Sequence, residues 1–311
     1  MDENIILSPS PHIFEKSTTK MLMKDVLIAL LPITLASIYF FRIKAVIVLV
    51  TCVISCVMAE YLFQKLMKKR ITIGDYSAVV TGMLLAFVLP PATPFWVCVV
   101  GSIVSIILAK QIFGGMGYNI FNPALLGRAF LMAAFPTILT TWTNPITLDA
   151  VTGATPLGLF KFEHQMTGYW NLFIGDVGGS IGETSVIALL IGAAYLFYRK
   201  AIDYRTPVAY LATVGAMAAI MHAINPSLYA TPIFYLLAGG LFLGAFFMAT
   251  DPVTTPVTKK GRWIFGIGCG VVTMVIRFWG GLPEGVMYSI LLMNAFTPLI
   301  NKLTRPKRFG T

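Results

Sequence analysis

The chain has 311 residues, of which 57% belong to the hydrophobic types (Ala, Val, Ile, Leu, Met, Phe, Trp, Tyr, Cys) and 12% are charged. The mean hydropathy is +0.80, and an ordinary soluble protein carries about twice this share of charged residues, ~25%. So few charges cannot cover so much apolar surface in water, which excludes a soluble enzyme, a disordered chain and a nucleic-acid-binding protein and leaves a polytopic membrane protein.

Ten apolar stretches are long enough, or nearly so, to cross a bilayer as helices, which takes about 17–25 residues. The third ends at Pro90-Pro91, and the fifth contains Arg128 and has Pro136 near its end. The sequence therefore predicts an all-α polytopic membrane protein with about ten transmembrane helices. Their expected ranges are 25–41, 44–66, 76–91, 94–113, 123–140, 183–199, 206–223, 231–249, 262–279 and 284–302.

The Lys and Arg residues lie mostly in alternate connections between these stretches. The side that holds both termini carries 18 of them, Lys110 included, and the opposite side carries four, with Arg128 left inside a span. Cytoplasmic loops of membrane proteins carry the excess of Lys and Arg. We therefore expect a protein of the cytoplasmic (inner) membrane with cytoplasmic termini, and the same bias explains the net charge of +10 without nucleic acid.

The expected organisation is a cytoplasmic segment 1–24, a first five-helix half 25–140, an extracytoplasmic loop 141–182, a second five-helix half 183–302 and a cytoplasmic tail 303–311. A weak repeat supports the two halves, because the run from Gly82 to Pro94 resembles the run from Gly240 to Pro252. With five spans each, the repeats are expected to be inverted in the membrane. Chance similarity between Leu-, Phe- and Gly-rich helices is the alternative.

The loop 141–182 is too long for a simple connector and contains the string Asp149-Ala150-Val151-Thr152-Gly153-Ala154-Thr155-Pro156. Ordered connections of this length are commonly functional. The Thr-Gly-Ala-Thr part has a chance probability on the order of one per cent in a chain of this length. An ordinary Thr/Gly turn that leads to a proline is the alternative.

This string resembles the flavinylation motif of bacterial redox-driven ion pumps, in which a flavin transferase moves FMN from FAD onto the last Thr as a phosphoester. The resemblance makes Thr155 the acceptor of covalent FMN. A Thr hydroxyl is a poor nucleophile without a base, and no His lies nearer than His164, so a separate transferase must activate it. Gly153 and Ala154 leave room for that enzyme to bind the backbone, and Asp149 is expected to help hold its metal-bound donor. Thr152 is a further expected flavin-site residue of the motif.

Further segments resemble the same family, the RnfD/NqrB family, which occurs in the Rnf ion-translocating electron transport complexes (RnfD) and in the sodium-pumping NADH:quinone reductases (NqrB). The length is closer to that of the Rnf members, because the quinone reductase members have additional N-terminal sequence. The segments cover nearly the whole chain in order and are Ser8-Pro9-Ser10-Pro11-His12, Asn122-Pro123-Ala124-Leu125-Leu126-Gly127-Arg128, Gly178-Gly179-Ser180-Ile181-Gly182-Glu183-Thr184-Ser185, Ala249-Thr250-Asp251-Pro252-Val253-Thr254, Glu284-Gly285-Val286 and Met293-Asn294.

The resemblance implies a component of a ferredoxin:NAD oxidoreductase that relays electrons through FMN on Thr155 and couples this transfer to Na⁺ or H⁺ translocation. It also implies iron–sulfur and flavin subunits as partners in the Rnf complex, a flavin transferase for maturation, and in some members a non-covalent riboflavin within the bundle. The chain has no Cys framework for an iron–sulfur cluster, and its four Cys lie in apolar runs, which predicts buried thiols and no metal site.

Two places in the chain are candidates for further contacts with the flavin. Gly179, Ser180 and Glu183 lie at the predicted start of the sixth span, where the N–H groups of a helix N-terminus favour an anion such as a phosphodiester. Glu183 would oppose such an anion, and simple helix capping by Ser180 or Thr184 is the alternative. Arg128 is a candidate for binding a flavin ring or phosphate, or for pairing with a carboxylate, because an unpaired charge in the bilayer is costly.

Asp251 is a candidate for the ion pathway, since it follows Thr250 where a short span ends and carbonyl groups become free. A capped turn formed with Thr254 is the alternative. The spacings Gly240/Gly244 and Gly266/Gly270 predict close helix packing. Two other functions fit parts of the pattern: a solute channel or secondary transporter with five plus five helices, and a structural anchor for redox partners. No catalytic residue is predicted.

Overall fold

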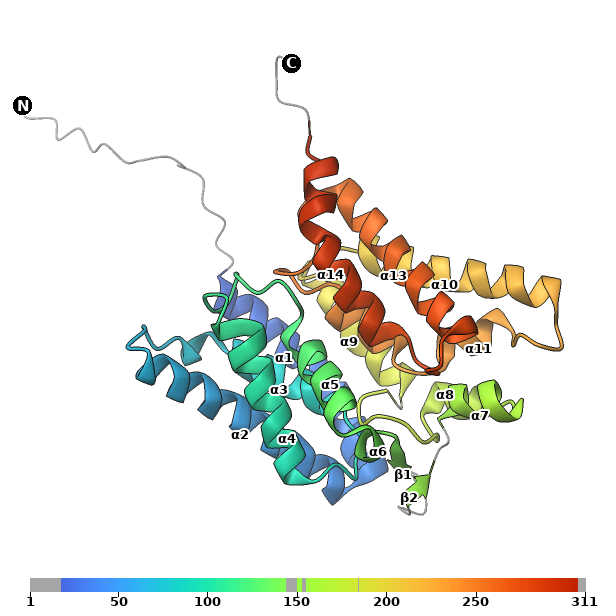
Figure 1. The fold of residues 1–311 in the computed structure, drawn as a ribbon, viewed down its shortest axis with the longest axis horizontal. Helices are drawn as coiled ribbons and strands as arrows, with labels where there is room; N and C mark the ends of the chain where they lie inside the picture. The colour runs from blue at the N-terminus through green and yellow to red at the C-terminus, as the bar shows by residue number, and fades with distance from the viewer. Residues whose placement is uncertain (1–17, 144–149, 153–154, 184, 307–311) are drawn as a thin grey trace, which may run out of the picture.

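The computed structural model describes residues 18–143, 150–152, 155–183 and 185–306, and this part of the chain is mostly helical (Figure 1). The first half contains α1 (Thr19–Phe41), α2 (Ile43–Leu66), η1 (Ile73–Asp75), α3 (Ser77–Phe87), α4 (Phe95–Ile103), η2 (Val104–Gln111), α5 (Pro123–Ala134) and α6 (Pro136–Leu139). The second half contains α9 (Val186–Tyr198), α10 (Arg205–Ile224), α11 (Pro232–Leu237), α12 (Leu241–Leu243), η3 (Gly244–Met248), α13 (Lys259–Trp279) and α14 (Val286–Leu303).

Each predicted span corresponds to helix in the structure, with two interruptions. The fifth is divided into α5 and α6 at Phe135, directly before Pro136, because proline removes a helix donor and restricts the residue before it. The eighth is divided into α11, α12 and η3 around Gly239, whose φ of 75° lies in the left-handed region that glycine enters at little cost. The sixth begins at Val186, three residues later than predicted.

The connection between the halves has a structure of its own, as its length suggested. Strands β1 (Thr141–Thr143) and β2 (Ala150–Thr152) pair antiparallel with Trp142 opposite Val151. Two short helices follow, α7 (Pro156–Glu163) and α8 (Tyr169–Ile174). In Figure 1, α6, β1 and β2 lie at the opposite end of the molecule from the C-terminal end of α14.

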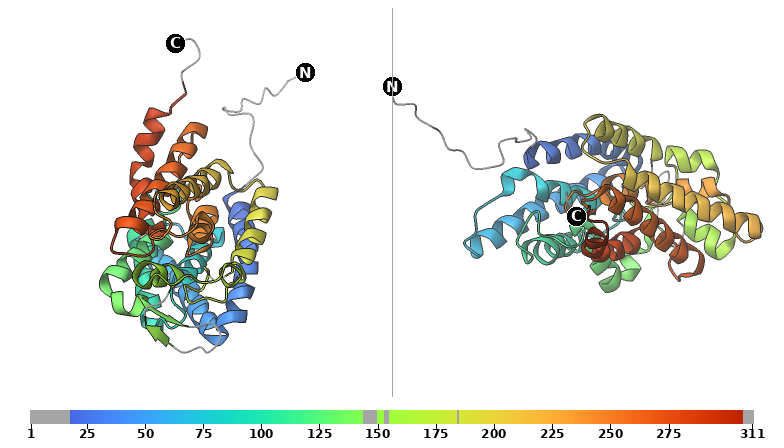
Figure 2. Two further views of the ribbon diagram at one scale, coloured as in Figure 1. Left: turned by 90° about the vertical axis from the view of Figure 1, so that its right-hand side faces the viewer. Right: turned by 90° about the horizontal axis from the view of Figure 1, so that it is seen from above.

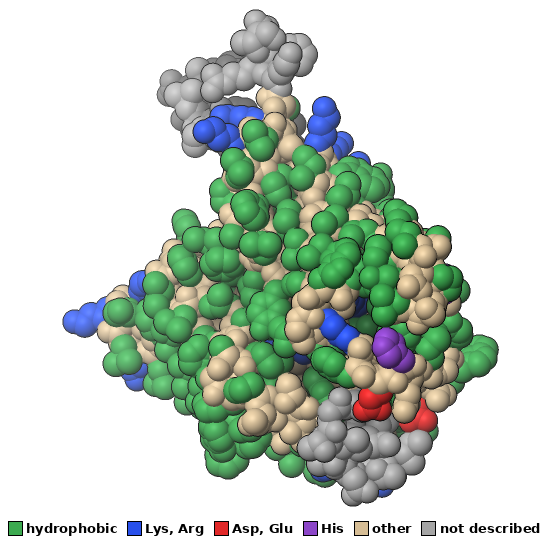
Figure 3. Space-filling view, turned by 45° about the vertical axis from the view of Figure 1, so that its right-hand side comes forward, with side chains coloured by type: hydrophobic (Ala, Val, Ile, Leu, Met, Phe, Trp, Pro, Cys, Tyr) green, Lys and Arg blue, Asp and Glu red, His purple; other side chains and the backbone are tan. Residues whose placement is uncertain are grey.

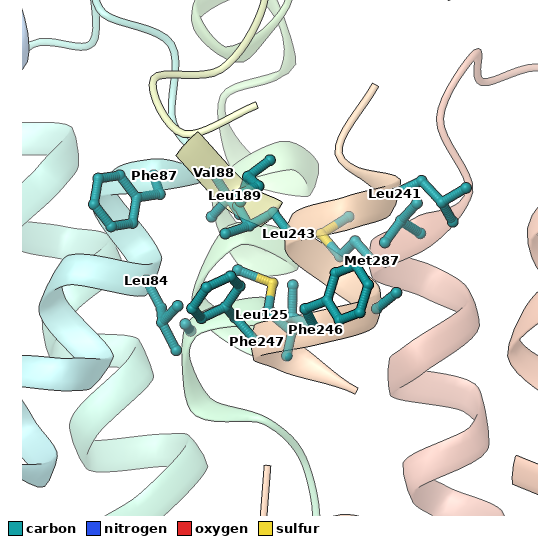
Figure 4. Close-up of a cluster of buried hydrophobic side chains, with 14 of the residues drawn as sticks. Leu84, Phe87, Val88, Leu125, Leu189, Leu241, Leu243, Phe246, Phe247 and Met287 are labelled. Carbon is teal, nitrogen blue, oxygen red and sulfur yellow. The ribbon is translucent and has the colours of Figure 1, made fainter. Parts of the chain in front are cut away.

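The two halves pack their own helices in corresponding ways. In the first half α2 packs on α3 and α4, and in the second half α10 packs on α11 and α13. Figures 1 and 2 show the halves as two neighbouring groups of helices. They meet in one hydrophobic core, to which α3, α5, α9, α12, η3 and α14 all contribute side chains (Figure 4). The repeat of the two halves and its inversion across a membrane stay predictions.

Much of the molecular surface is apolar (Figure 3). Large hydrophobic side chains are exposed along the long helices, for example Leu35 (68%) in α1 and Ile54 (57%) in α2. Among the described residues, four helices are long and apolar enough to cross a membrane, namely α1, α2, α10 and α13, and α3, α4 with η2, α5 and α9 are shorter apolar helices. Because water disfavours such a surface, we conclude that the chain is an all-α multi-pass membrane protein.

Lys110 does not lie on the surface, where the sequence analysis placed it. Its ammonium group is buried and lies 2.8 Å from Glu60 Oε2 in α2, and it donates to Ser77 Oγ at 2.6 Å. Lys110 lies in η2, a π-helical continuation of α4, and the adjacent Gln111 also donates to Glu60. The Lys110 charge is therefore neutralised inside the bundle by Glu60, and the predicted bias between the two sides of the membrane then rests on the other Lys and Arg residues.

Glycines allow the closest helix contacts, as predicted for two spacings. A Cβ atom on Gly244 would lie 2.3 Å from Val286 Cγ1, and one on Gly266 would lie 2.5 Å from the carbonyl oxygen of Thr206. A third contact was not predicted. Gly192 in α9 approaches α1 so closely that a Cβ atom would lie 2.2 Å from the carbonyl oxygen of Ala29.

We expect Gly192→Ala to destabilise the contact between α1 and α9 by about 1–3 kcal/mol, because a backbone carbonyl cannot move aside as a side chain can. The matched control is Gly215→Ala in α10, where the added methyl group would meet Leu236 at an ordinary 3.7 Å and helix propensity should add about 0.5–1 kcal/mol of stability. Thermal unfolding of both variants in detergent micelles measures the difference. Equal midpoints for the two variants would contradict this account of the interface.

Asp203, which precedes α10 and lies outside the spanning segments, joins the first residue of α10 to α13. Asp203 Oδ2 lies 2.6 Å from Nη1 of Arg205 and 2.6 Å from Nη1 of Arg262, and its Oδ1 accepts from the backbone N–H of Arg205. Desolvation raises the pKa of this carboxyl group, but the N–H of Arg205 and the two guanidinium groups outweigh it and hold the pKa below its ordinary value.

A carboxyl group with a lowered pKa stabilises the fold above its unfolded pKa, and this contribution is lost as the pH falls through the folded value. We therefore expect Asp203→Asn to lower the unfolding temperature at about pH 7 and this deficit to shrink as the pH falls below the ordinary Asp pKa of ~3.9 toward the lower folded value. Thermal unfolding of both proteins over this range tests the prediction. A deficit that stays constant with pH would assign the loss to packing.

Candidate functional site

Thr155, the predicted acceptor, is the residue that begins α7. It has an extended backbone conformation (φ −70°, ψ 152°), and its Oγ1 accepts a hydrogen bond from the backbone N–H of Gly158 at 3.1 Å. Threonine followed by proline favours this arrangement, because the hydroxyl group satisfies a free helix donor and proline suits the first helical position. The side chain is 4% exposed.

The other motif residues are only partly visible. Thr152 ends β2 and pairs with Thr141 across the hairpin. Asp149, Gly153 and Ala154 lie outside the described residues. The motif thus joins a β-hairpin to α7, and Thr155 lies at the point where the helix starts.

A cavity of about 270 Å³ lies beside Thr155. Arg128 of α5 and Glu284 also line this cavity. The structure therefore brings Arg128 close to Thr155, although the sequence analysis considered these two residues separately. The volume is close to the lower end of ordinary small-molecule pockets, about 300 Å³. Most of the lining is apolar or aromatic, and it comprises Met132, Thr140, Trp142, Gly158, Phe162, Gly281, Leu282, Pro283, Met287 and Tyr288 in addition to the three residues named above.

Arg128 is buried and paired with two carboxylates. Its Nη1 lies 3.2 Å from Glu183 Oε1, and its Nη2 lies 3.1 Å from Glu284 Oε2. The structural pairing that the sequence left open is therefore present. Within the described residues, the Nε of Arg128 and the Oε1 of Glu284 have no hydrogen-bond partner, so both groups retain hydrogen-bonding capacity next to the cavity.

The segment that contains Gly179, Ser180 and Glu183 differs from the expectation. Because α9 begins at Val186 and is capped by the Ser185 hydroxyl group, these residues do not form the N-terminus of a helix. Capping by Ser180 is therefore wrong, and Thr184 lies outside the described residues. The N–H groups of Ile181 and Gly182 donate to the carbonyl groups of Leu89 and Phe87.

Of the three flavin contacts predicted in this segment, only one is connected to the cavity beside Thr155. Glu183 reaches the site through its ion pair with Arg128, whereas Gly179 and Ser180 are not among the residues that line the cavity. The N–H groups of Ile181 and Gly182 are already used, and they are not free for a phosphate group.

Two functional candidates were missed by the sequence analysis. Glu284 belongs to a quoted motif, but nothing in the sequence paired it with Arg128. Arg277, near the end of α13, donates to the carbonyl groups of Tyr235 (2.6 Å) and Ala238 (3.1 Å) at the break between α11 and α12. A basic residue inside a predicted span is the signal that could have identified Arg277, as it identified Arg128.

Lys161 fixes α7 to the end of α13. Its Nζ donates to three backbone carbonyl groups, those of Ile276 (3.2 Å), Gly280 (2.5 Å) and Leu282 (3.0 Å). The last carbonyl groups of a helix have no partner within the helix, and a cation there also interacts favourably with the helix dipole. Desolvation lowers the pKa of this ammonium group relative to an ordinary lysine.

Asp251 follows η3 and lies beside a small cavity of about 70 Å³ that Lys110 and Asn122 also line. Its Oδ2 accepts a hydrogen bond from Thr254 Oγ1 at 3.0 Å, so the capped turn that the sequence analysis weighed is present. The carbonyl group of Met248 accepts from Asn122 Nδ2 at 3.2 Å. The helix break beside Asp251 is thus stabilised by side chains from both halves.

A metal centre has no support in the described part of the chain. It contains no group of three or more His, Cys, Asp or Glu residues that could hold an ion. All four Cys residues are buried free thiols.

Comparison with known proteins identifies relatives over almost the whole length. Residues 6–310 match the model of the NQR2, RnfD, RnfE family. The chain is 48% identical to the D subunit of the Na⁺-translocating ferredoxin:NAD⁺ oxidoreductase complex of Acetobacterium woodii, over 99% of this chain and 96% of the relative. It is 45% identical to the D subunit of the proton-translocating complex of Clostridium ljungdahlii, over 98% and 96%, and 40% identical to the D subunit of the ion-translocating oxidoreductase complex of Stutzerimonas stutzeri, over 95% and 93%.

Proposed function

Because the chain belongs to the NQR2, RnfD, RnfE family, we propose that it is the membrane-embedded RnfD component of an ion-translocating ferredoxin:NAD oxidoreductase complex of the cytoplasmic membrane. Three relatives with matching lengths carry this kind of name. Iron–sulfur and flavin subunits of the same complex are the proposed redox partners, and the termini are proposed to face the cytoplasm, with the loop that carries Thr155 on the other side.

The protein is proposed to relay electrons through FMN attached to Thr155 as a phosphoester. Bound FMN would supply the ability to accept and pass on electrons singly. The observation that carries this proposal is the position of Thr155 between the start of α7 and a mostly apolar cavity. The eight-residue helix α7 would present its positive dipole end to the phosphate, and the N–H of Gly158, which Thr155 Oγ1 accepts in the structure, would lie beside the ester.

The residues around the cavity suit a planar aromatic group. Trp142 and Tyr288 offer aromatic surfaces, and Phe162 adds apolar area. Arg128 provides a guanidinium group at the wall, which offers hydrogen-bond donors there, while its charge is balanced by its carboxylate partners. Its two carboxylate partners hold the guanidinium in place, so these residues position and polarise the site and need no proton of their own.

For the coupling to ion movement we propose Asp251 as the residue of this chain that contacts the ion. The support is the helix break after η3 and the adjoining cavity, because half-helix ends and free carbonyl groups bind cations in transporters. The named relatives differ in the ion, which is Na⁺ in one and a proton in another, so either ion is compatible with the family.

The direct test is mass spectrometry of the peptide that contains residues 141–182, taken from the native protein of a host that possesses a flavin transferase. We expect a mass increase equal to FMN minus water, located on Thr155, and a fluorescent band that survives denaturing electrophoresis. An unmodified peptide from such a host would reject the covalent relay. Solute transport by the purified chain without any flavin would instead favour a secondary transporter.

A further inference from the structure

The hydroxyl group of Thr155 is poorly placed to react in the structure as it stands. Its side chain is 4% exposed, and its Oγ1 already accepts the N–H of Gly158. To form the phosphoester, this oxygen must reach the phosphorus of FAD inside the active site of a second protein. An oxygen enclosed between α7 and the cavity wall cannot do so, because an enzyme cannot surround a buried group.

The helix α7, which follows Thr155, is held by the packing of its buried face and by Lys161. On the inner side of α7, Leu157 is buried. The ring centroid of Phe160 lies 5.4 Å from that of Phe234 and 6.2 Å from that of Tyr235, and both of these residues belong to α11. With only eight residues, α7 has little stability of its own. Its position therefore depends on these contacts and on the hydrogen bonds of Lys161.

Lys161 makes the polar part of this attachment. One ammonium group serves three carbonyl groups at the end of α13 and in the turn after it. The turn continues to Gly281, Leu282, Pro283 and Glu284, which line the cavity beside Thr155. Lys161 thus joins the helix that carries the acceptor to the wall that faces it.

We propose that Thr155 receives FMN while α7 is detached from α11 and α13, and that Lys161 is the positioning residue that seats α7 afterwards. This inference rests on the proposed function. In the transfer, Thr155 Oγ forms a bond to the FMN phosphorus of FAD, the bond from that phosphorus to the bridging oxygen of the pyrophosphate breaks, and AMP leaves. The hydroxyl proton passes to a base of the transferase, and no electrons are exchanged. Seating α7 then brings the attached group to the cavity.

The test compares two orders of addition. In the first, the full-length chain is purified unmodified in detergent micelles, and flavin transferase with FAD is then added; in the second, chain and transferase are made together. For the folded chain, we expect Lys161→Met to be labelled about tenfold faster than the wild type. The variant lacks the charged hydrogen bonds that hold α7 in place, so α7 should be detached about tenfold more often. When the proteins are made together, both chains should be labelled equally.

Three further variants make the result specific. Lys161→Arg keeps the charge and the donors and should return the rate toward that of the wild type. Leu157→Ala weakens the seating of α7 by packing alone and should also accelerate labelling, which keeps the test valid should Lys161→Met fail to fold. Lys260→Met removes an exposed lysine at the start of α13 and should change nothing.

The outcomes separate the two proposals. Labelling of Thr155 at the same rate in the folded wild type, Lys161→Met and Leu157→Ala would overturn the detached state and leave the covalent flavin in place. Absence of label on the wild type in both orders of addition would overturn the covalent flavin itself, and the inference with it.

Discussion

Thr155→Val is expected to remove all covalently bound flavin and to reduce electron transfer through the assembled complex to background. Valine has nearly the shape of threonine but lacks the oxygen that would form the ester, so no transferase can modify it. The same change removes the cap of α7, which costs about 1 kcal/mol. That loss is too small to unfold the chain, so the missing flavin is what the assay reports.

The measurements are in-gel flavin fluorescence and ferredoxin-dependent NAD reduction by membranes that contain the whole complex. Thr155→Ser keeps both the cap and the nucleophile, and it should retain at least part of the flavin. Thr137→Val changes an exposed threonine of α6 outside the motif and should leave flavin attachment unchanged. Full activity of the Thr155→Val complex would reduce the chain to a structural anchor.

The helical bundle could be predicted because the physics that forms it is local in sequence. Apolar runs of bilayer length depend on single residues and their neighbours. The breaks before Pro136 and at Gly239 also have local causes, but the predicted spans ran through both positions. The burial of a charged side chain, in contrast, could not be predicted from local sequence. Lys110 ends an apolar run, as a surface lysine would, and only the position of Glu60 on another helix explains its burial.

The sequence names Thr155 and Arg128 as candidates, and the structure places both at one cavity, whereas the acceptor role of Thr155 stays a prediction. Glu284 and Lys161 were not predicted: Glu284 reaches the cavity from the residues before α14, and Lys161 bonds to the turn that lines it. Their distances follow from the packing of both halves, which no local pattern contains. The segment 178–183 shows the opposite error: its glycines resemble a phosphate-binding helix start, but its N–H groups pair with the end of α3.

Arg128 has more than one role in this arrangement. It comes from the first half, and its two partners, Glu183 and Glu284, come from the segments that precede α9 and α14. One guanidinium group therefore ties the first half to two places beside the second half, and it also lines the cavity next to Thr155. A change at this residue should affect stability before it affects chemistry.

Arg128→Met is expected to destabilise the chain by about 3–5 kcal/mol, because it removes the cation that pairs directly with the buried Glu183 and with the partly exposed Glu284. Arg199→Met is the matched control: Arg199 pairs with Asp25, but its side chain is 43% exposed, and such pairs contribute about 0–1 kcal/mol. Thermal unfolding in detergent micelles measures both. Adding Glu183→Gln and Glu284→Gln to Arg128→Met removes the two unpaired charges and should recover much of the loss. A deficit no larger than that of Arg199→Met, or one that the two amides do not relieve, would show that the halves are held together by their apolar core alone.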